Sequence, residues 1–184
     1  MALEIERRFL VSGDQWRPHA HGARAIRQGY LATGNGELTL RVRLARAPDG
    51  AMAAYLTLKL PAVGAAAASA PPGWALTRQE YEYPIPAIDA EALLEQSAHQ
   101  VSKTRYGLDL PGGDWVLDVF EAANAPLVVA EVELERADQA VAVPAWCSRE
   151  ITGRRDLSNA ALAHRPLASW PAHERDALQW PQGR

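Results

Sequence analysis

Charged residues recur at every second position in several short segments of this 184-residue chain. The first such segment is Glu4-Ile5-Glu6-Arg7-Arg8. Alternate side chains of a β-strand lie on the same face, so Glu4, Glu6 and Arg8 would share one face of a strand. Pairs of like charge with the same spacing follow at Arg41/Arg43, Glu80/Glu82, Lys103/Arg105 and Glu131/Glu133.

These pairs suit two kinds of ligand. Clustered carboxylates bind Mg²⁺ or Mn²⁺, which take oxygen ligands and keep some of their water. Clustered arginines and lysines bind phosphate, and one arginine can contact two phosphate oxygens at once. A site that offers both groups would bind a polyphosphate together with its metal ion.

The elements that would carry these pairs are short strands joined mostly by tight turns. The period-two alternation predicts eight strands, at about 3–11, 25–31, 37–46, 53–60, 77–83, 101–107, 115–120 and 127–135. Gly34-Asn35-Gly36 is one of the turn signals between them. We therefore expect a mainly β fold of the α+β type, an eight-stranded antiparallel closed β-barrel with a few peripheral helices.

The remaining segments are expected to be helices or loops. Asp89 could cap a helix that ends near His99, and Ser158 could cap a shorter one over 159–164. Residues 61–76 are rich in alanine, proline and glycine and are expected to form a loop. The tail, 167–184, could form a short helix around 173–180 that packs on the barrel.

The charged faces admit two interpretations. In most β-proteins the polar face is wet, which would place these charges on the outside of the barrel. However, the charges cluster by sign within each strand, and both lysines of the chain, Lys59 and Lys103, lie on these faces. The alternative is a charged lumen. Because an unpaired buried ion costs several kcal/mol, that lumen would have to be a wet tunnel that binds metal and a highly charged ligand.

The composition limits the classes of partner. A net charge of −3 argues against a general binder of nucleic acid or membrane surfaces. No window is apolar enough for a membrane span, and Glu4 stands where a signal peptide would begin its apolar run. The single cysteine excludes an internal disulfide. We expect a cytoplasmic protein without membrane or nucleic-acid partners, and the sequence leaves open whether it forms a homodimer.

The charged blocks occur in an order that resembles the CYTH superfamily, also called triphosphate tunnel metalloenzymes. The opening Glu4-Ile5-Glu6-Arg7-Arg8 resembles the family's ExExK signature, and the resemblance extends over about residues 1–166. The later matching blocks are Arg27-Gln28-Gly29-Tyr30-Leu31, Arg41-Val42-Arg43, Thr57-Leu58-Lys59, Glu80-Tyr81-Glu82-Tyr83, Lys103-Thr104-Arg105-Tyr106, Asp118-Val119-Phe120 and Glu131-Val132-Glu133-Leu134.

The resemblance implies an antiparallel tunnel that binds a triphosphate and Mg²⁺ or Mn²⁺. It assigns the metal to Glu4, Glu6, Asp118, Glu131 and Glu133. It assigns the phosphates to Arg8, Arg41, Arg43, Lys59, Lys103 and Arg105. Lys103, Arg8 and Glu82 are the predicted catalytic residues, which would orient or deprotonate the attacking water or position the bases.

The activity that this resemblance implies is hydrolysis of a terminal phosphoanhydride, with inorganic tripolyphosphate as the expected substrate. The family also implies three alternatives: a class IV-type adenylate cyclase, a thiamine or nucleoside triphosphatase, and a non-catalytic polyphosphate-binding module. One departure favours the last alternative. Arg8 stands where the family usually has lysine, and arginine cannot give up its proton at working pH.

A second expectation concerns the tail. Trp170 and Trp180 stand in an otherwise polar segment, so the tail could close one mouth of the tunnel.

Overall fold

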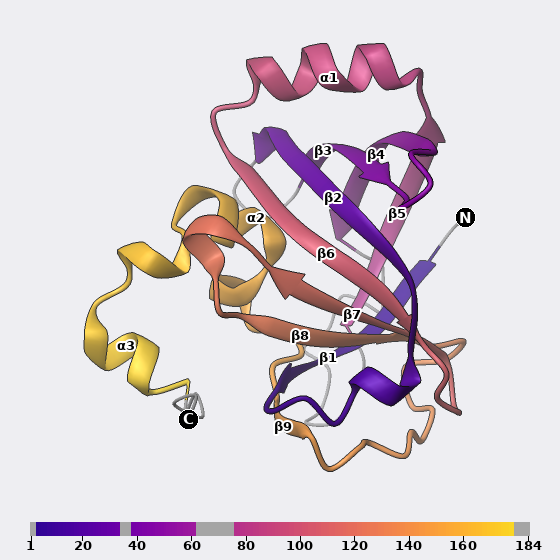
Figure 1. The fold of residues 1–184 in the computed structure, drawn as a ribbon, viewed down its shortest axis with the longest axis vertical. Helices are drawn as coiled ribbons and strands as arrows, with labels where there is room; N and C mark the ends of the chain where they lie inside the picture. The colour runs from indigo at the N-terminus through magenta and orange to yellow at the C-terminus, as the bar shows by residue number, and fades with distance from the viewer. Residues whose placement is uncertain (1–2, 34–37, 62–75, 179–184) are drawn as a thin grey trace.

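A closed antiparallel barrel forms the body of the molecule (Figure 1). The computed structural model describes residues 3–33, 38–61 and 76–178. Its barrel strands are β1 (Leu3–Val11), β2 (Ala20–Thr33), β3 (Thr39–Arg46), β4 (Met52–Pro61), β5 (Leu76–Pro84), β6 (Gln100–Leu108), β7 (Asp114–Phe120) and β8 (Val128–Glu133). Their order is β5-β4-β3-β2-β6-β7-β8-β1, and pairing of β5 with β1 closes the barrel. The predicted eight-stranded closed barrel is confirmed.

Besides shifts of one or two residues at strand ends, the strands differ from the prediction in their number and in the length of β2. β2 spans Ala20–Thr33 and is much longer than predicted, because it pairs with both β3 and β6 along most of its length. A short ninth strand, β9 (Cys147–Glu150), was not predicted and pairs with the end of β1. β7 begins one residue early, at Asp114, which the sequence had suggested was part of a turn.

The strand register places the charged residues on a single face around the barrel. Residues directly opposite each other in antiparallel strands share a face. Arg8 lies opposite Glu131, and Glu6 lies opposite Glu133. The same holds for Arg105 with Asp118, and for Lys59 with Glu80.

On β1, β3, β4, β7 and β8 the other face is apolar and is covered from outside. On β1, β7 and β8 it packs against Trp16 and Trp146, which lie outside the barrel strands. On β3 and β4 it packs against α1 (Ala87–Gln96), with Val42, Ala54 and Leu94 in one cluster. The charged face is therefore the lumen.

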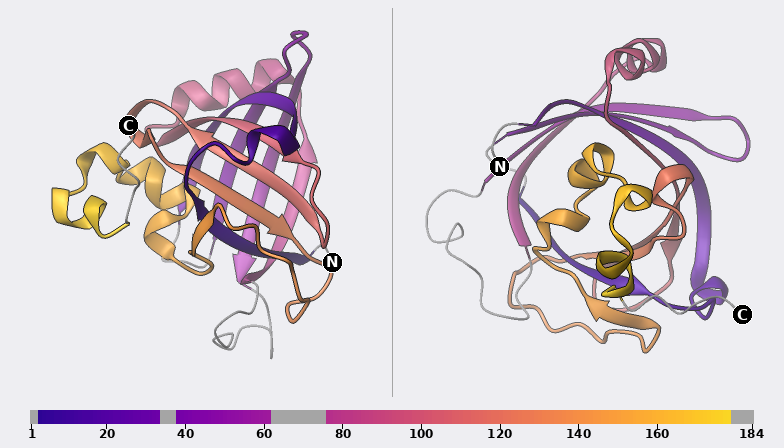
Figure 2. Two further views of the ribbon diagram at one scale, coloured as in Figure 1. Left: turned by 60° about the horizontal axis from the view of Figure 1, so that its bottom comes forward. Right: turned by 90° about the vertical axis from the view of Figure 1, so that its left-hand side faces the viewer.

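The lumen is closed at one end by the chain that follows β9. Leu10, Val101 and Phe120 belong to the same alternating face as the charged residues, but at this end they are apolar. They pack with a segment made of η4 (Arg155–Leu157), α2 (Asn159–His164), η5 (Leu167–Ser169) and α3 (Ala172–Asp176), which we call the plug. Figure 2 (right) shows these helices lying across the barrel opening.

Of the expected helices, α2 forms as predicted. Its cap is Ser158, whose Oγ accepts a hydrogen bond from the backbone N–H of Ala161 at 3.1 Å. The prediction for α1 was wrong at both ends. Pro86 is its N-cap, so Asp89 lies in the first turn. The negative charge of Asp89 still interacts favourably with the helix dipole there. The helix ends at Gln96, before His99.

The tail also packs as part of the plug. Trp170 and Leu178 are buried in the cluster that fills the closed end. The residues that reach the charged lumen are Leu157 and Asn159, so the closure begins earlier than the expected tail. Trp180, the other tryptophan invoked for closure, lies outside the described residues. No helix in the described ranges is long and apolar enough to cross a membrane.

We predict that Leu162→Ala lowers the free energy of unfolding by about 2–5 kcal/mol, because Leu162 is fully buried in the plug and its truncation leaves a cavity. Chemical denaturation of the purified variant measures this. His173→Ala, at an exposed position of α3, is the control and should change stability by less than about 0.5 kcal/mol. Equal effects of the two substitutions would show that the plug does not pack on the barrel.

Candidate active site

The lumen holds two networks of ion pairs. The first lies next to the plug and joins β1, β6, β7 and β8. We call it the inner network, and its members are Arg8, Lys103, Arg105, Asp118 and Glu131. The second follows β1, β3, β4 and β5. We call it the wall network, and its members are Glu4, Glu6, Arg41, Arg43, Lys59, Arg78, Glu80 and Glu82.

In the inner network two carboxylates hold three cations. Glu131 accepts hydrogen bonds from Nε of Arg8 at 2.9 Å and from Nη2 of Arg105 at 2.7 Å. Asp118, which has no exposed surface, accepts two from Arg105 at 2.7 Å and one from Lys103 at 2.5 Å. Every carboxylate of this network is therefore balanced by a cation in direct contact.

The plug takes part in the inner network. Lys103 also donates to Oδ1 of Asn159 at 3.2 Å, and Nη1 of Arg8 donates to the carbonyl oxygen of Leu157 at 3.2 Å. The backbone N–H of Arg8 donates to Oγ1 of Thr152 at 3.1 Å. Packing of the plug thus fixes the two cations that lie deepest in the lumen.

Burial and neighbouring charge act in opposite directions on these groups. Burial would raise the pKa of Asp118, but Arg105 and Lys103 lower it below its ordinary value. The pKa of Glu131 is lowered in the same way by Arg105 and Arg8. For Lys103 burial wins over the attraction of Asp118 and lowers the pKa to about 8. Lys103 therefore keeps its proton at neutral pH but can lose it in mildly alkaline solution.

In the wall network each carboxylate of β5 pairs with cations from other strands. Glu82 accepts from Nη2 of Arg43 at 2.7 Å and from Oγ1 of Thr57 at 2.9 Å. Glu80 lies 2.8 Å from Nζ of Lys59, which also donates to Glu4 at 2.6 Å. The positions of Glu80 and Glu82 suit residues that hold the basic side chains in place.

Several buried guanidinium groups keep unused donors. Among the described residues, the guanidinium nitrogens without a hydrogen-bond partner are Nη2 of Arg8 and Nε of Arg41, Arg43 and Arg78. A buried donor without an acceptor costs about 1–3 kcal/mol. An anion rich in oxygen atoms could satisfy these donors.

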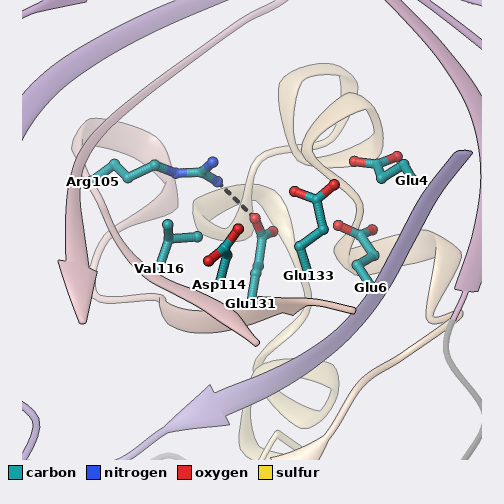
Figure 3. Close-up of a pocket in the computed structure, with 7 residues that line it drawn as sticks. All are labelled: Glu4, Glu6, Arg105, Asp114, Val116, Glu131 and Glu133. Carbon is teal, nitrogen blue, oxygen red and sulfur yellow. Dashed lines mark hydrogen bonds and ion pairs between the residues drawn. The ribbon is translucent and has the colours of Figure 1, made fainter. Parts of the chain in front are cut away.

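Carboxylates dominate a cavity in the lumen that borders the inner network. A cavity of about 110 Å³ is lined by Glu4, Glu6, Asp114, Glu131 and Glu133, together with Arg105 and Val116 (Figure 3). Burial raises the pKa of Glu6, and Glu131 and Glu4 raise it further. Burial also raises the pKa of Glu133, with Glu4, Glu80 and Asp114 adding to it. This side of the lumen therefore holds more negative charge than its arginines balance.

This donor set fits a hard divalent cation, which prefers carboxylate oxygens and would relieve the repulsion. Within the described ranges, no three histidine, cysteine, aspartate or glutamate side chains are already gathered as a metal site. Metal binding would therefore require the carboxylates to turn toward a common centre.

The structure brings the predicted site residues together in one lumen. Arg78 and Asp114, which are charged residues of this lumen, were missed. Arg78 shares the face of Glu80 and Glu82 and pairs with both Glu4 and Glu6. Asp114 lies opposite Glu133 and lines the cavity. In both cases the period of two was visible in the sequence, at Arg78-Glu80-Glu82 and at Asp114-Val116-Asp118.

The family model for the CYTH domain matches residues 2–162. The chain belongs to the CYTH family. Its curated relatives include two proteins named inorganic triphosphatase. The one from Acetivibrio thermocellus is 33% identical over 92% of this chain and 99% of the relative. The one from Nitrosomonas europaea is 35% identical over 87% of this chain and 96% of the relative.

Solved structures resemble this CYTH barrel. The crystal structure of the inorganic triphosphatase NE1496 matches with a TM-score of 0.58 and 34% identity, covering 94% of this chain and 99% of that one. The PH1012 protein from Pyrococcus horikoshii OT3 matches with a TM-score of 0.50 at 18% identity, covering 73% of this chain and 80% of that one. The second likeness shows the fold alone.

We predict that Glu131→Gln lowers the free energy of unfolding by about 3–5 kcal/mol, because it leaves Arg8 and Arg105 without a carboxylate partner. Glu133→Gln is the matched control. Glu133 is exposed and its carboxylate is repelled by neighbouring acids, so its neutralisation should change stability by less than about 0.5 kcal/mol. Urea denaturation at pH 7 without metal compares them, and equal losses would contradict the pairing described here.

Acid should destabilise the protein through Glu4. Burial would raise the pKa of Glu4, but Lys59 and Arg78 lower it from 4.5 to about 2. The folded state then binds fewer protons than the unfolded state between these values, so the stability that Glu4 contributes is complete above pH 4.5 and is lost as the pH falls toward 2. Denaturation curves across this range should show a shallower loss for Glu4→Gln. Exposed Glu135→Gln should retain the wild-type slope, and an unchanged slope in Glu4→Gln would refute the assignment.

Proposed function

We propose that this CYTH protein hydrolyses the terminal phosphoanhydride of inorganic tripolyphosphate with the help of Mg²⁺ or Mn²⁺. The observation that carries the proposal is the lumen itself. Arginines with unused buried donors and a group of mutually repelling carboxylates lie within one barrel. The curated relatives named inorganic triphosphatase support the choice of substrate.

The basic residues would bind the phosphates. Arg41 and Arg43 stand on neighbouring positions of the lumen face of β3, and Arg105, Lys59 and Lys103 lie on the lumen faces of β6 and β4. Bidentate contacts from arginine hold phosphate oxygens in a fixed orientation. Charge that builds up on the transferred phosphoryl group would be stabilised by donors that are already in place, which is the main requirement of phosphoryl transfer.

The carboxylates would hold the metal. Glu4, Glu6 and Glu133 are the leading ligands, with Glu131 beside them in the same cavity. Asp118 stays a predicted ligand, but both its oxygens already accept hydrogen bonds from Arg105 or Lys103, which suits a residue that positions these cations. A bound divalent ion would neutralise phosphate charge and lower the pKa of water.

The predicted catalytic residues take more limited roles. Lys103 carries a proton at neutral pH, so we assign it to orienting the phosphoryl group or the attacking water rather than to removing a proton. Glu82 holds Arg41 and Arg43 in place. Burial would lower the pKa of Arg8, but Glu131 and Glu6 raise it overall, so Arg8 acts as a fixed positive charge. This role needs no proton transfer and is compatible with turnover.

The proposal is tested by incubating the purified protein with tripolyphosphate, ATP and thiamine triphosphate, with and without Mg²⁺ or Mn²⁺. Metal-dependent release of phosphate from tripolyphosphate is expected. Cyclic AMP with pyrophosphate from ATP would indicate a cyclase, and preferred hydrolysis of thiamine triphosphate would indicate an organic triphosphatase. Binding of tripolyphosphate without turnover of any substrate would leave a binding module.

We further predict that Glu133→Gln lowers the turnover number for tripolyphosphate by about a hundredfold or more, because a ligand that acts in the transition state is lost. Phosphate release under saturating Mg²⁺ measures the effect. Glu135→Gln removes the same charge from an exposed position just beyond the strand and should keep wild-type activity. Near-normal turnover in Glu133→Gln would remove Glu133 from the proposed metal site.

A further inference from the structure

Arg78 is the cation that contacts both carboxylates of the opening motif. Its Nη2 lies 2.9 Å from Oε2 of Glu4 and donates to Oε1 of Glu6 at 3.1 Å. Arg78 lies directly opposite Glu4 in the β1–β5 pairing that closes the barrel. Its position between the two carboxylates is therefore set by the strand register.

The two carboxylate oxygens of Glu4 differ in their hydrogen bonds. Nζ of Lys59 donates a hydrogen bond to Oε1 of Glu4 at 2.6 Å. Oε2 of Glu4 forms no hydrogen bond, although Nη2 of Arg78 lies 2.9 Å from it. Arg78 thus neutralises Glu4 without an aligned hydrogen bond. A contact of this kind can be exchanged at lower cost than a bidentate pair.

A divalent ion on Glu4 and Glu6 would meet the guanidinium of Arg78 within a few ångströms. Like charges at that separation repel, and both cations need the same carboxylate oxygens. Arg78 and a metal ion therefore compete for one place in the lumen.

Arg78 also has an unused hydrogen-bond donor, which could bind a phosphate oxygen. Its Nε is buried without a hydrogen-bond partner, whereas its side chain as a whole is 29% exposed and so has room to move. A phosphate group entering beside the metal would supply the acceptors that the guanidinium loses.

We propose that Arg78 is an internal counter-cation, which neutralises Glu4 and Glu6 when no metal is bound and passes to the phosphates when a divalent ion takes the carboxylates. This inference rests on the proposed metal-dependent function. It makes Arg78 a positioning residue, and it makes metal and triphosphate bind with positive coupling.

The test measures Mn²⁺ affinity by isothermal titration calorimetry without any phosphate present. Arg78→Met removes the competitor, so its dissociation constant for Mn²⁺ should fall at least about tenfold relative to wild type. Arg7→Met is the matched control. This variant removes the same charge from the outer face of β1, where Arg7 pairs with Glu150 and lies over the ring of Phe9. It should leave the Mn²⁺ affinity unchanged.

Unchanged or weaker Mn²⁺ binding in Arg78→Met would overturn the proposal, because a merely structural arginine could not strengthen the site when it is removed. Absence of Mn²⁺ binding in both proteins would overturn it as well. The two proposals can also fail separately. If Arg78→Met binds Mn²⁺ more tightly but the wild type hydrolyses no triphosphate, the role of Arg78 is upheld and the proposed function is refuted.

If Arg78→Met does not fold, a crystal structure of the wild type with Mn²⁺ decides the question. The proposal expects Arg78 to have left Glu4 and Glu6. An ion bound to these carboxylates while Arg78 retains both contacts would overturn it, as would an ion bound elsewhere.

Discussion

Pairing of buried charge inside the barrel is the interaction on which the rest of the structure depends. Taking a single ion out of water costs several kcal/mol, and removal of one partner from a buried pair leaves that cost unopposed. Asp118 and Glu131 meet this demand by holding Lys103 and Arg105 from β6 and Arg8 from β1. A shift of register by one residue would move the charged side chains of a strand to its other face and separate every pair. The register that closes the barrel is therefore also the register that balances the charge in its lumen.

Local alternation made much of this arrangement predictable. Pairs such as Arg41/Arg43 and Glu131/Glu133 have the period of a strand, and antiparallel pairing then brings like-facing residues of different strands together. The partners within the lumen were not predictable in this way. Which carboxylate Arg78 contacts depends on the β1–β5 register, and no local pattern encodes that choice.

The plug was also beyond local prediction. The inward face changes from charged to apolar along β1, from Glu4 and Glu6 to Leu10, but the segment that packs there follows more than a hundred residues later. β9 has four residues and takes its place from pairing with the end of β1, so its own sequence carries little signal. Such features follow from tertiary packing, which overrides weak local preference.

We infer that the lumen exchanges internal ion pairs for contacts to a triphosphate. A crystal structure of the protein with tripolyphosphate, grown in EDTA so that the ligand stays intact, tests it most directly. We expect phosphate oxygens within hydrogen-bond distance of Arg41, Arg43 and Arg105, and we expect these arginines to have left their carboxylate partners. Tripolyphosphate bound outside the barrel, with the lumen pairs unchanged, would contradict it.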